Sequence, residues 1–190
     1  MKFLLTILFL VYSSFSYARL PLDRDLVPVE HVDLVRYQGK WFEIASIPQF
    51  FQRKCTKNTT AEYTLLPDNL MKVYNACTIK NGTTISSEGR AKPIDTTNAK
   101  LNVTFAKLFD RYLFWFSGKY WVIYLEPNYQ YAIVGHPTRD YGWILSRTPE
   151  LAPDILKELT HYLKVAGYDP CRFYTTPQEG GLQTKKSLCK

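Results

Sequence analysis

The sequence predicts an all-β fold: an eight-stranded antiparallel up-and-down β-barrel with one C-terminal α-helix packed outside it. Apolar or alternating stretches rich in Tyr, Phe, Val, Ile and Thr follow one another at regular spacing, with short turns between them. Strands joined mostly by hairpins favour a barrel, because closure leaves no sheet edge unpaired. The predicted strands cover residues 40–47, 60–66, 70–79, 83–93, 99–106, 119–126, 131–136 and 141–147.

The predicted helix accounts for the two most apolar strands. Strands 119–126 and 131–136 are apolar on both faces, so a second layer must cover them from outside. From Pro153 to residue 166 the apolar side chains recur at helical spacing, and Gly167 suits a C-terminal cap. We therefore expect this helix to pack on the outer face of the later strands.

The N-terminus predicts export. Residues 1–18 combine one early Lys, a short apolar core and small residues before a cleavage point after Ala18, which is typical of a secretory signal peptide. The expected domains are this signal, a barrel domain with its helix at 19–176, and a C-terminal tail at 177–190. No Cys directly follows the apolar core, so we expect a periplasmic or secreted protein that is not lipid-anchored by an N-terminal Cys.

Charge and histidine placement exclude several function classes. The formal net charge is +7, but Lys and Arg are spread along the chain rather than gathered in a basic stripe, so no nucleic-acid partner is expected. Weak attraction to anionic lipid is the natural use of this charge. His31, His136 and His161 stand alone, outside any catalytic or metal-binding motif, so we expect no catalytic residue, no metal and no cofactor.

Four cysteines in an exported chain predict two disulfides. A hairpin centred on Asp68 places Cys55 about four residues, or roughly 13 Å, from the position opposite Cys77. Because a disulfide needs Cα atoms within about 7 Å, we favour Cys55–Cys189 with Cys77–Cys171. The alternative is Cys55–Cys77 with Cys171–Cys189.

Three motifs, in order, resemble those of the lipocalin family. They are Gly39-Lys40-Trp41, the segment "EPNYQYAIVG" and the segment "WILSRTP", which contains Arg147. The resemblance covers about residues 32–176, and the local sequence around these motifs is most similar to that of bacterial lipocalins and apolipoprotein D. It implies structural roles: Gly39 allows a tight turn into the first strand, Trp41 plugs the closed end, and Arg147 lies over the indole.

Alternation along the strands predicts which side chains line the cavity of such a barrel. For Tyr63, Asn75 and Trp143 the resemblance implies the same, because the matching positions of apolipoprotein D line its pocket. The predicted lining residues are Tyr63, Val73, Asn75, Val103, Phe105, Tyr120, Val122, Val134, Tyr141 and Trp143.

Aromatic residues mark the predicted ligand entrance. Phe50 and Phe51 begin the first long loop, and Phe114 and Trp115 lie in the apolar, basic-flanked loop 107–121. The lipocalin resemblance places both loops at the open end. Aromatic and basic residues together favour a membrane–water interface, so we expect peripheral membrane contact there; a lid or a dimer contact is the alternative.

The resemblance implies an exported, non-enzymatic lipocalin that binds and transports a small hydrophobic ligand, with a fatty acid or a lysophospholipid as the expected ligand. Two alternatives stay open. A free Cys77 in the cavity would suit an isomerase-type enzyme, and a barrel filled by its own side chains would suit an interaction protein. The protein is expected to be a monomer or a homodimer.

Overall fold

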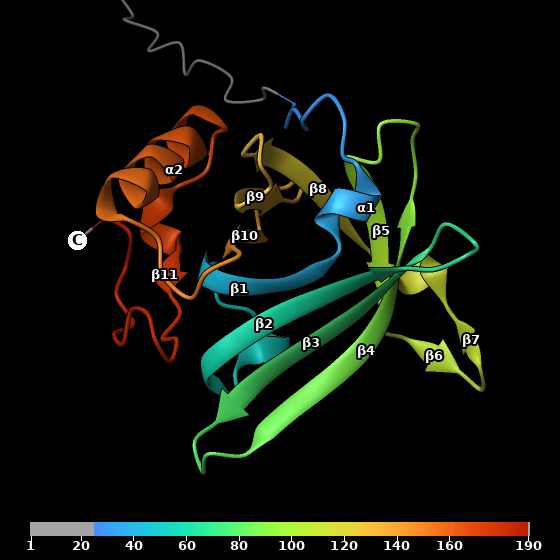
Figure 1. Ribbon diagram of the computed structural model, residues 1–190, viewed down its shortest axis with the longest axis horizontal. Coiled ribbons are helices and arrows are strands. Elements are labelled where there is room, and N and C mark those ends of the chain that lie inside the picture. The colour runs from blue at the N-terminus through green and yellow to red at the C-terminus, as the bar shows by residue number, and fades with distance from the viewer. Residues whose placement is uncertain (1–24, 190) are drawn as a thin grey trace, which may run out of the picture.

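The computed structural model describes residues 25–189, so the predicted signal peptide lies outside the described residues. Eight antiparallel strands form one closed barrel, in which β1 pairs with both β2 and β10, as predicted (Figure 1). The barrel strands are β1 (Gly39–Ser46), β2 (Cys55–Leu65), β3 (Met71–Ile79), β4 (Thr84–Pro93), β5 (Lys100–Thr104), β8 (Gly118–Leu125), β9 (Tyr131–Gly135) and β10 (Gly142–Ser146).

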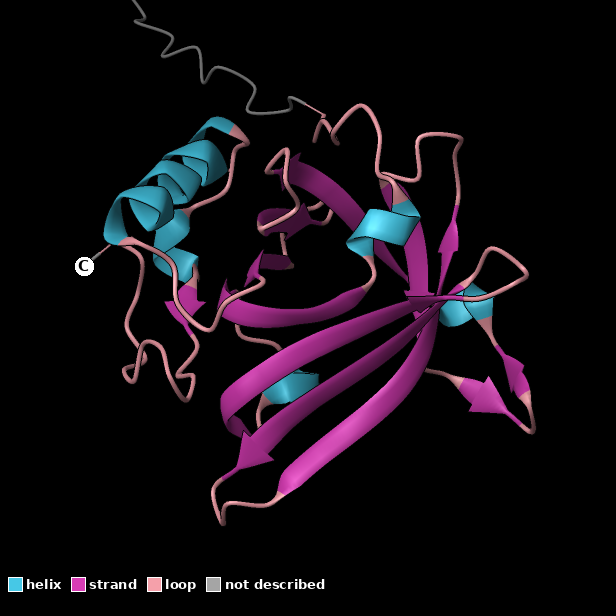
Figure 2. Cartoon of the chain, viewed as in Figure 1, coloured by secondary structure: helices cyan, strands magenta, loops and turns pink. Residues whose placement is uncertain are grey.

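Further elements surround the barrel, and Figure 2 shows one longer helix beside it together with several short helices and arrows. A two-stranded hairpin, β6–β7, stands apart from the barrel wall. The short strand β11 pairs with the C-terminal end of β1. The elements are α1 (Leu34–Tyr37), η1 (Phe50–Gln52), β6 (Lys107–Leu108), β7 (Arg111–Tyr112), η2 (Phe114–Phe116), α2 (Pro153–Val165), η3 (Pro170–Arg172) and β11 (Tyr174–Thr175). None of the helices in the described residues is long and apolar enough to cross a bilayer.

Two apolar cores lie on opposite sides of the barrel wall. The inner core contains Trp41, Leu101 and Val122, and the outer core contains Ile123 and Leu159, so neighbouring residues of β8 face opposite cores. The outer core is the contact between the later strands and α2, which lies outside the barrel in Figure 1. A strand that is apolar on both faces is stable here because helix and interior each bury one face.

Arg147 and Trp41 close one end of the barrel. The Trp41 side chain is fully buried, and its Nε1 donates a hydrogen bond of 2.9 Å to the carbonyl of Tyr37. The Arg147 guanidinium carbon lies 3.9 Å from the centroid of the Trp41 ring system, close enough for a cation–π contact. Gly39 has φ +88°, a backbone conformation that residues with a Cβ rarely adopt, so glycine is required where the chain turns from α1 into β1.

The favoured disulfide pairing is wrong, and the alternative is present. Cys55 is bonded to Cys77, with Cα atoms 5.6 Å apart, and Cys171 is bonded to Cys189. A regular ladder would keep Cys55 far from Cys77, but the β2–β3 register shifts twice between Cys55 and Thr60. These shifts place Cys55 opposite Ile79, two residues from Cys77, and a diagonal pair in a bulged, twisted ladder is within disulfide reach.

The segment predicted as a tail forms part of the barrel wall. β1 and β2 pair only as far as Phe42 and Thr60, and beyond that point the tail fills the gap between them. Gln178 is 2% exposed, and its Nε2 donates to the carbonyls of Glu43 and Thr59, one on each strand. Together with backbone bonds from Thr176 N to the carbonyl of Ile44 and from Asn58 N to the carbonyl of Pro177, this amide replaces the missing ladder bonds.

We predict that Trp41→Ala lowers the free energy of unfolding by about 3–5 kcal/mol, because it empties a fully buried aromatic site. Trp115→Ala is the matched control, since Trp115 is 82% exposed and its loss should change stability by less than about 0.5 kcal/mol. Urea unfolding followed by circular dichroism measures both. Equal effects of the two substitutions would contradict the role assigned to Trp41.

Candidate ligand-binding site

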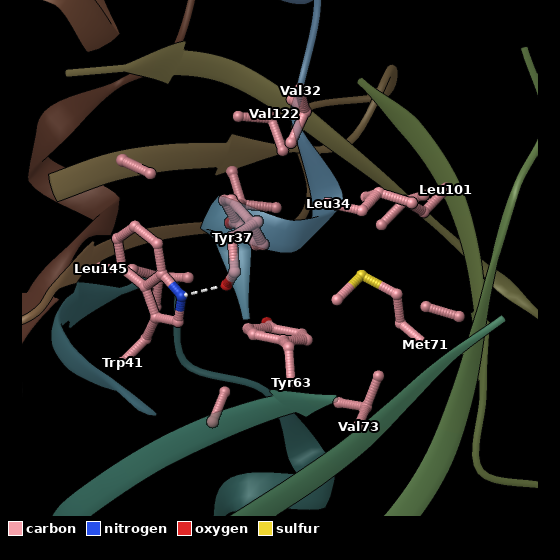
Figure 3. Close-up of a cluster of buried hydrophobic side chains, with 14 of the residues drawn as sticks. Val32, Leu34, Tyr37, Trp41, Tyr63, Met71, Val73, Leu101, Val122 and Leu145 are labelled. Atoms are coloured by element: carbon pink, nitrogen blue, oxygen red, sulfur yellow. Dashed lines mark hydrogen bonds between the residues drawn. The ribbon is translucent and has the colours of Figure 1, made fainter. Parts of the chain in front are cut away.

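The barrel interior brings together most of the predicted lining residues. The buried ones include Tyr63, Val73, Val122 and Val134. Partly buried side chains packed against the same core include Val103, Tyr120 and Trp143. Figure 3 shows Tyr63, Met71 and Val73 close together in this core, so Met71, which alternation also places on the inner face of β3, belongs with the predicted lining residues.

Phe105 and Tyr141 lie at the open rim rather than in the buried interior. β5 ends at Thr104 and β10 begins at Gly142, so neither residue is in a strand and alternation does not place it. Phe105 is 41% exposed and its ring covers Gly89, where an added Cβ would come within 2.8 Å of the ring. A larger residue in place of Gly89 would displace this ring from the rim.

Asn75 supplies a polar group to the inner face of β3. It is one register step along the same face from Val73, and its side chain is partly buried. The amide oxygen, Oδ1, is inaccessible to solvent and has no hydrogen-bond partner among the described residues. Since buried polar atoms are nearly always hydrogen-bonded, this oxygen is an acceptor that a ligand or a water can use.

Tyr37, Tyr63 and Tyr120 form a hydroxyl network inside the barrel, called here the tyrosine network. The hydroxyl of Tyr120 lies 2.8 Å from that of Tyr37 and 2.9 Å from that of Tyr63. The rings form a series of contacts that begins at Trp41: Tyr37 is 4.9 Å from Trp41, Tyr63 is 5.4 Å from Tyr37, and Tyr120 is 6.1 Å from Tyr63, measured between centroids. Figure 3 shows Trp41, Tyr37 and Tyr63 close together in the inner core.

Burial sets the protonation state of the tyrosine network. Desolvation disfavours a phenolate, so burial raises the pKa of Tyr63 to about 12 and raises the pKa of both Tyr37 and Tyr120 well above the usual range. All three hydroxyls are therefore neutral at physiological pH and can each donate one proton. Tyr37 was missed by the sequence reasoning because it lies in α1, before the first strand, where strand alternation gives no signal.

Glu43 is a hydrogen-bond acceptor near the C-terminal end of β1, where the first loop and the C-terminal segment meet. It is the only charged side chain that is buried among the described residues. Its carboxylate accepts hydrogen bonds from the Ser46 hydroxyl, from Nε2 of Gln52 in η1, and from the Thr176 hydroxyl beside the tail. This buried carboxylate thus links the first loop and the C-terminal segment to β1.

A hollow of about 350 Å³ opens where β1 and β2 diverge. Its lining includes Glu43, Gln52, Arg53, Tyr174 and Lys185, and none of the ten predicted cavity residues. It is therefore separate from the inner core, and it is bounded by the first loop and the C-terminal segment.

Exposed aromatic side chains gather at the open end. The first loop and the β5–β8 loop leave the barrel at the same end, because β1 and β5 run in the same direction in the antiparallel order. Phe50 is 76% exposed in the first loop. In the second loop Phe109 is 91%, Trp115 82% and Phe116 71% exposed; these three are called here the rim aromatic group. Phe114, predicted as an entrance residue, is partly buried instead.

The chain matches the family model described as a lipocalin-like domain over residues 32–178. The chain belongs to the lipocalin family. It is 39% identical to temperature-induced lipocalin-1 of Arabidopsis thaliana over 157 residues, covering 82% of this chain and 84% of that protein. It is 35% identical to outer membrane lipoprotein Blc of Escherichia coli K12 over 159 residues, covering 83% and 85%.

Relatives outside plants and bacteria agree with this assignment. This lipocalin is 32% identical to apolipoprotein D of Macaca fascicularis over 160 residues, with 79% of each chain covered. Among solved structures, insecticyanin of the tobacco hornworm Manduca sexta superposes with a TM-score of 0.65 at 27% identity, covering 84% of this chain and 88% of that one. The predicted resemblance to bacterial lipocalins and apolipoprotein D is confirmed.

Cys77 is not the thiol nucleophile that the enzymatic alternative requires. Its sulfur is bonded to Cys55, and all four cysteines of this lipocalin are in disulfides. Among the described residues, no group of three or more His, Cys, Asp or Glu side chains could hold a metal ion. The chemistry that the interior offers is apolar contact, the neutral hydroxyls of the tyrosine network and the amide of Asn75.

We predict that the stability of this lipocalin falls as pH rises from about 10 to about 12. The unfolded chain releases its tyrosine protons near pH 10, whereas the buried hydroxyl of Tyr63 holds its proton to a pKa of about 12. Below about pH 10 both states are protonated and this contribution is constant. Urea unfolding at a series of pH values measures the loss, and Tyr63→Phe should reduce its slope. A free energy of unfolding that stays constant up to about pH 12 would contradict burial of these hydroxyls.

Proposed function

We propose that this lipocalin binds and transports a small hydrophobic molecule in its barrel, without catalysing a reaction on it. The observation that carries the proposal is an apolar interior that contains polar groups with unused hydrogen-bonding capacity, above all Asn75 Oδ1. A core that only had to be filled would gain nothing from a buried amide oxygen without a partner, because such a group costs about 1–3 kcal/mol. A ligand pocket needs such groups to orient its guest.

Fatty acids and lysophospholipids are the ligand classes that we propose. Each methylene moved from water into the barrel contributes about 0.8 kcal/mol, so an acyl chain supplies most of the affinity. The disulfides fit an oxidising compartment, which supports a periplasmic or secreted location where such lipids would have to cross water. A closed floor at Trp41 and an open rim leave one direction of entry.

We predict that Val103→Asp weakens binding of an acyl-chain probe at least tenfold, because it places a carboxylate beside the bound chain. Asn102→Asp is the matched control: it introduces the same charge one residue away on the opposite face of β5. Fluorescence titration with a polyene fatty acid measures both. If wild type binds no probe, the barrel is filled and the interaction-protein alternative stands; if both variants bind as wild type does, the binding site lies elsewhere.

We propose further that the rim aromatic group docks the open end on a lipid surface. Large apolar side chains that are 71–91% exposed are costly in water, and Lys107, Arg111 and Lys119 lie in or beside the same loop. Aromatic rings favour the headgroup region, and each basic residue adds about 1 kcal/mol near an anionic surface. Docking would let a ligand pass between bilayer and barrel without crossing water.

We predict that Trp115→Ser combined with Phe116→Ser abolishes co-sedimentation with vesicles containing anionic lipid. Val35→Ser is the matched control, since Val35 is 64% exposed in α1 at the closed end and should leave vesicle binding intact. Sedimentation velocity of the same variants tests the competing occupant, a second copy of this chain. Loss of a dimer with no effect on vesicle binding would replace the docking proposal with a dimer contact.

A further inference from the structure

The tyrosine network holds one proton that it does not use. Three hydroxyls carry three donor protons, and the two hydrogen bonds among them use two. The three hydroxyls have no other hydrogen-bond partner among the described residues. Whichever way the two bonds are oriented, one O–H group points at no acceptor of the protein. In an apolar interior such a donor is costly unless a ligand or a water accepts from it.

Geometry selects which hydroxyl faces the ligand. Tyr120 lies between the other two, and its oxygen can accept a proton from Tyr37 and from Tyr63 at once. It is also the last ring in the series of contacts that begins at Trp41, and it is the most exposed of the three tyrosines. When both neighbours donate to Tyr120, its own O–H is left over, and the two incoming bonds polarise it and make it a stronger donor.

The surroundings select an uncharged partner. No Lys, Arg or His side chain is buried in the inner core of the described residues, and the nearby Arg147 is engaged by three backbone carbonyls below the Trp41 ring. A carboxylate or phosphate brought beside Tyr120 would lose its hydration with no cation to replace it. A carbonyl, a hydroxyl or a protonated carboxyl loses far less and can accept the proton.

We infer that Tyr120 donates a hydrogen bond to a neutral oxygen at the buried end of the ligand, with Tyr37 and Tyr63 as positioning residues behind it. The inference rests on the proposed function and narrows it: the ligand is an apolar molecule that enters with an uncharged oxygen group first. A lysophospholipid enters tail first, so its methyl end would leave the Tyr120 proton unused. Asn75 Oδ1 offers a second contact, to any hydroxyl that the same ligand carries.

The test compares a long-chain methyl ketone with the alkane of the same carbon number, both delivered from cyclodextrin and both measured by displacement of a polyene fatty acid. We expect wild type to favour the ketone over the alkane, and Tyr120→Phe to reduce this preference by a factor of about five to ten, the value of one buried hydrogen bond. Tyr63→Phe keeps the Tyr120 donor but removes one of the two hydrogen bonds that polarise it, so this variant should reduce the ketone preference by only about two- to threefold. Tyr162→Phe is the matched control, because its hydroxyl bonds the carbonyl of Ile123 on the outer side of the wall.

A second readout does not depend on the variants folding. The carbonyl stretch of the bound ketone should lie at lower wavenumber than in alkane solvent, since a hydrogen bond weakens the C=O bond. An unshifted carbonyl in wild type, or a full ketone preference in folded Tyr120→Phe, would overturn the inference while leaving acyl binding intact. Failure of wild type to bind either compound or the fatty acid probe would overturn the proposed function itself, and the inference with it.

Discussion

Arg147 holds together the three chain segments that make the closed end. Its guanidinium donates to the carbonyls of Arg36, Lys40 and Tyr129, which belong to the chain before β1, to β1 itself and to the β8–β9 turn. Its planar guanidinium donates to all three segments at once, and the Arg36 side chain adds a second link by donating a 2.8 Å hydrogen bond to the carbonyl of Pro127 in the same turn. The face of the Arg147 guanidinium lies on Trp41 as well. Trp41 donates a hydrogen bond to the carbonyl of Tyr37, and the Tyr37 hydroxyl is hydrogen-bonded to that of Tyr120, so a continuous series of contacts connects Arg147 to the tyrosine network.

The open end is held together by several separate contacts rather than by one central side chain. There β1 and β2 separate, and the wall is completed by polar side chains rather than by strand pairing: Glu43 binds the first loop and Thr176, while Gln178 joins the two strands. Both disulfides lie in this half, one fastening the bulged start of β2 to β3 and the other fastening the C-terminal segment to itself. Covalent bonds and buried polar contacts therefore connect the segments of the open end where β1 and β2 are no longer paired.

Regular features of this fold could be predicted from the sequence, and irregular ones could not. Alternation placed Val73, Val103 and Val122 on the inner face, because a strand has a fixed period of two. The disulfide pairing failed at Asn58, whose φ of +57° lies within the bulged part of β2 and breaks that period. Residues beyond strand ends, such as Phe105, were misplaced for the same reason. Tyr37, Glu43 and Gln178 act through partners far away in the chain, and no local pattern marks such contacts.

The closed and open halves of the barrel differ in the polar and charged groups that they present along its axis. The interior is apolar except for Asn75 and the tyrosine network, where every hydroxyl is neutral and one O–H group has no acceptor among the described residues. The rim, in contrast, carries exposed rings and basic side chains that suit the boundary between lipid and water. A ligand that is apolar along its length and carries a neutral oxygen at its leading end meets complementary surroundings at each stage of entry. A ligand with a charged leading end finds complementary groups only at the rim, because no cationic side chain is buried in the inner core of the described residues. Under the proposed function, the distribution of charge along the barrel axis would therefore favour ligands whose leading end is uncharged.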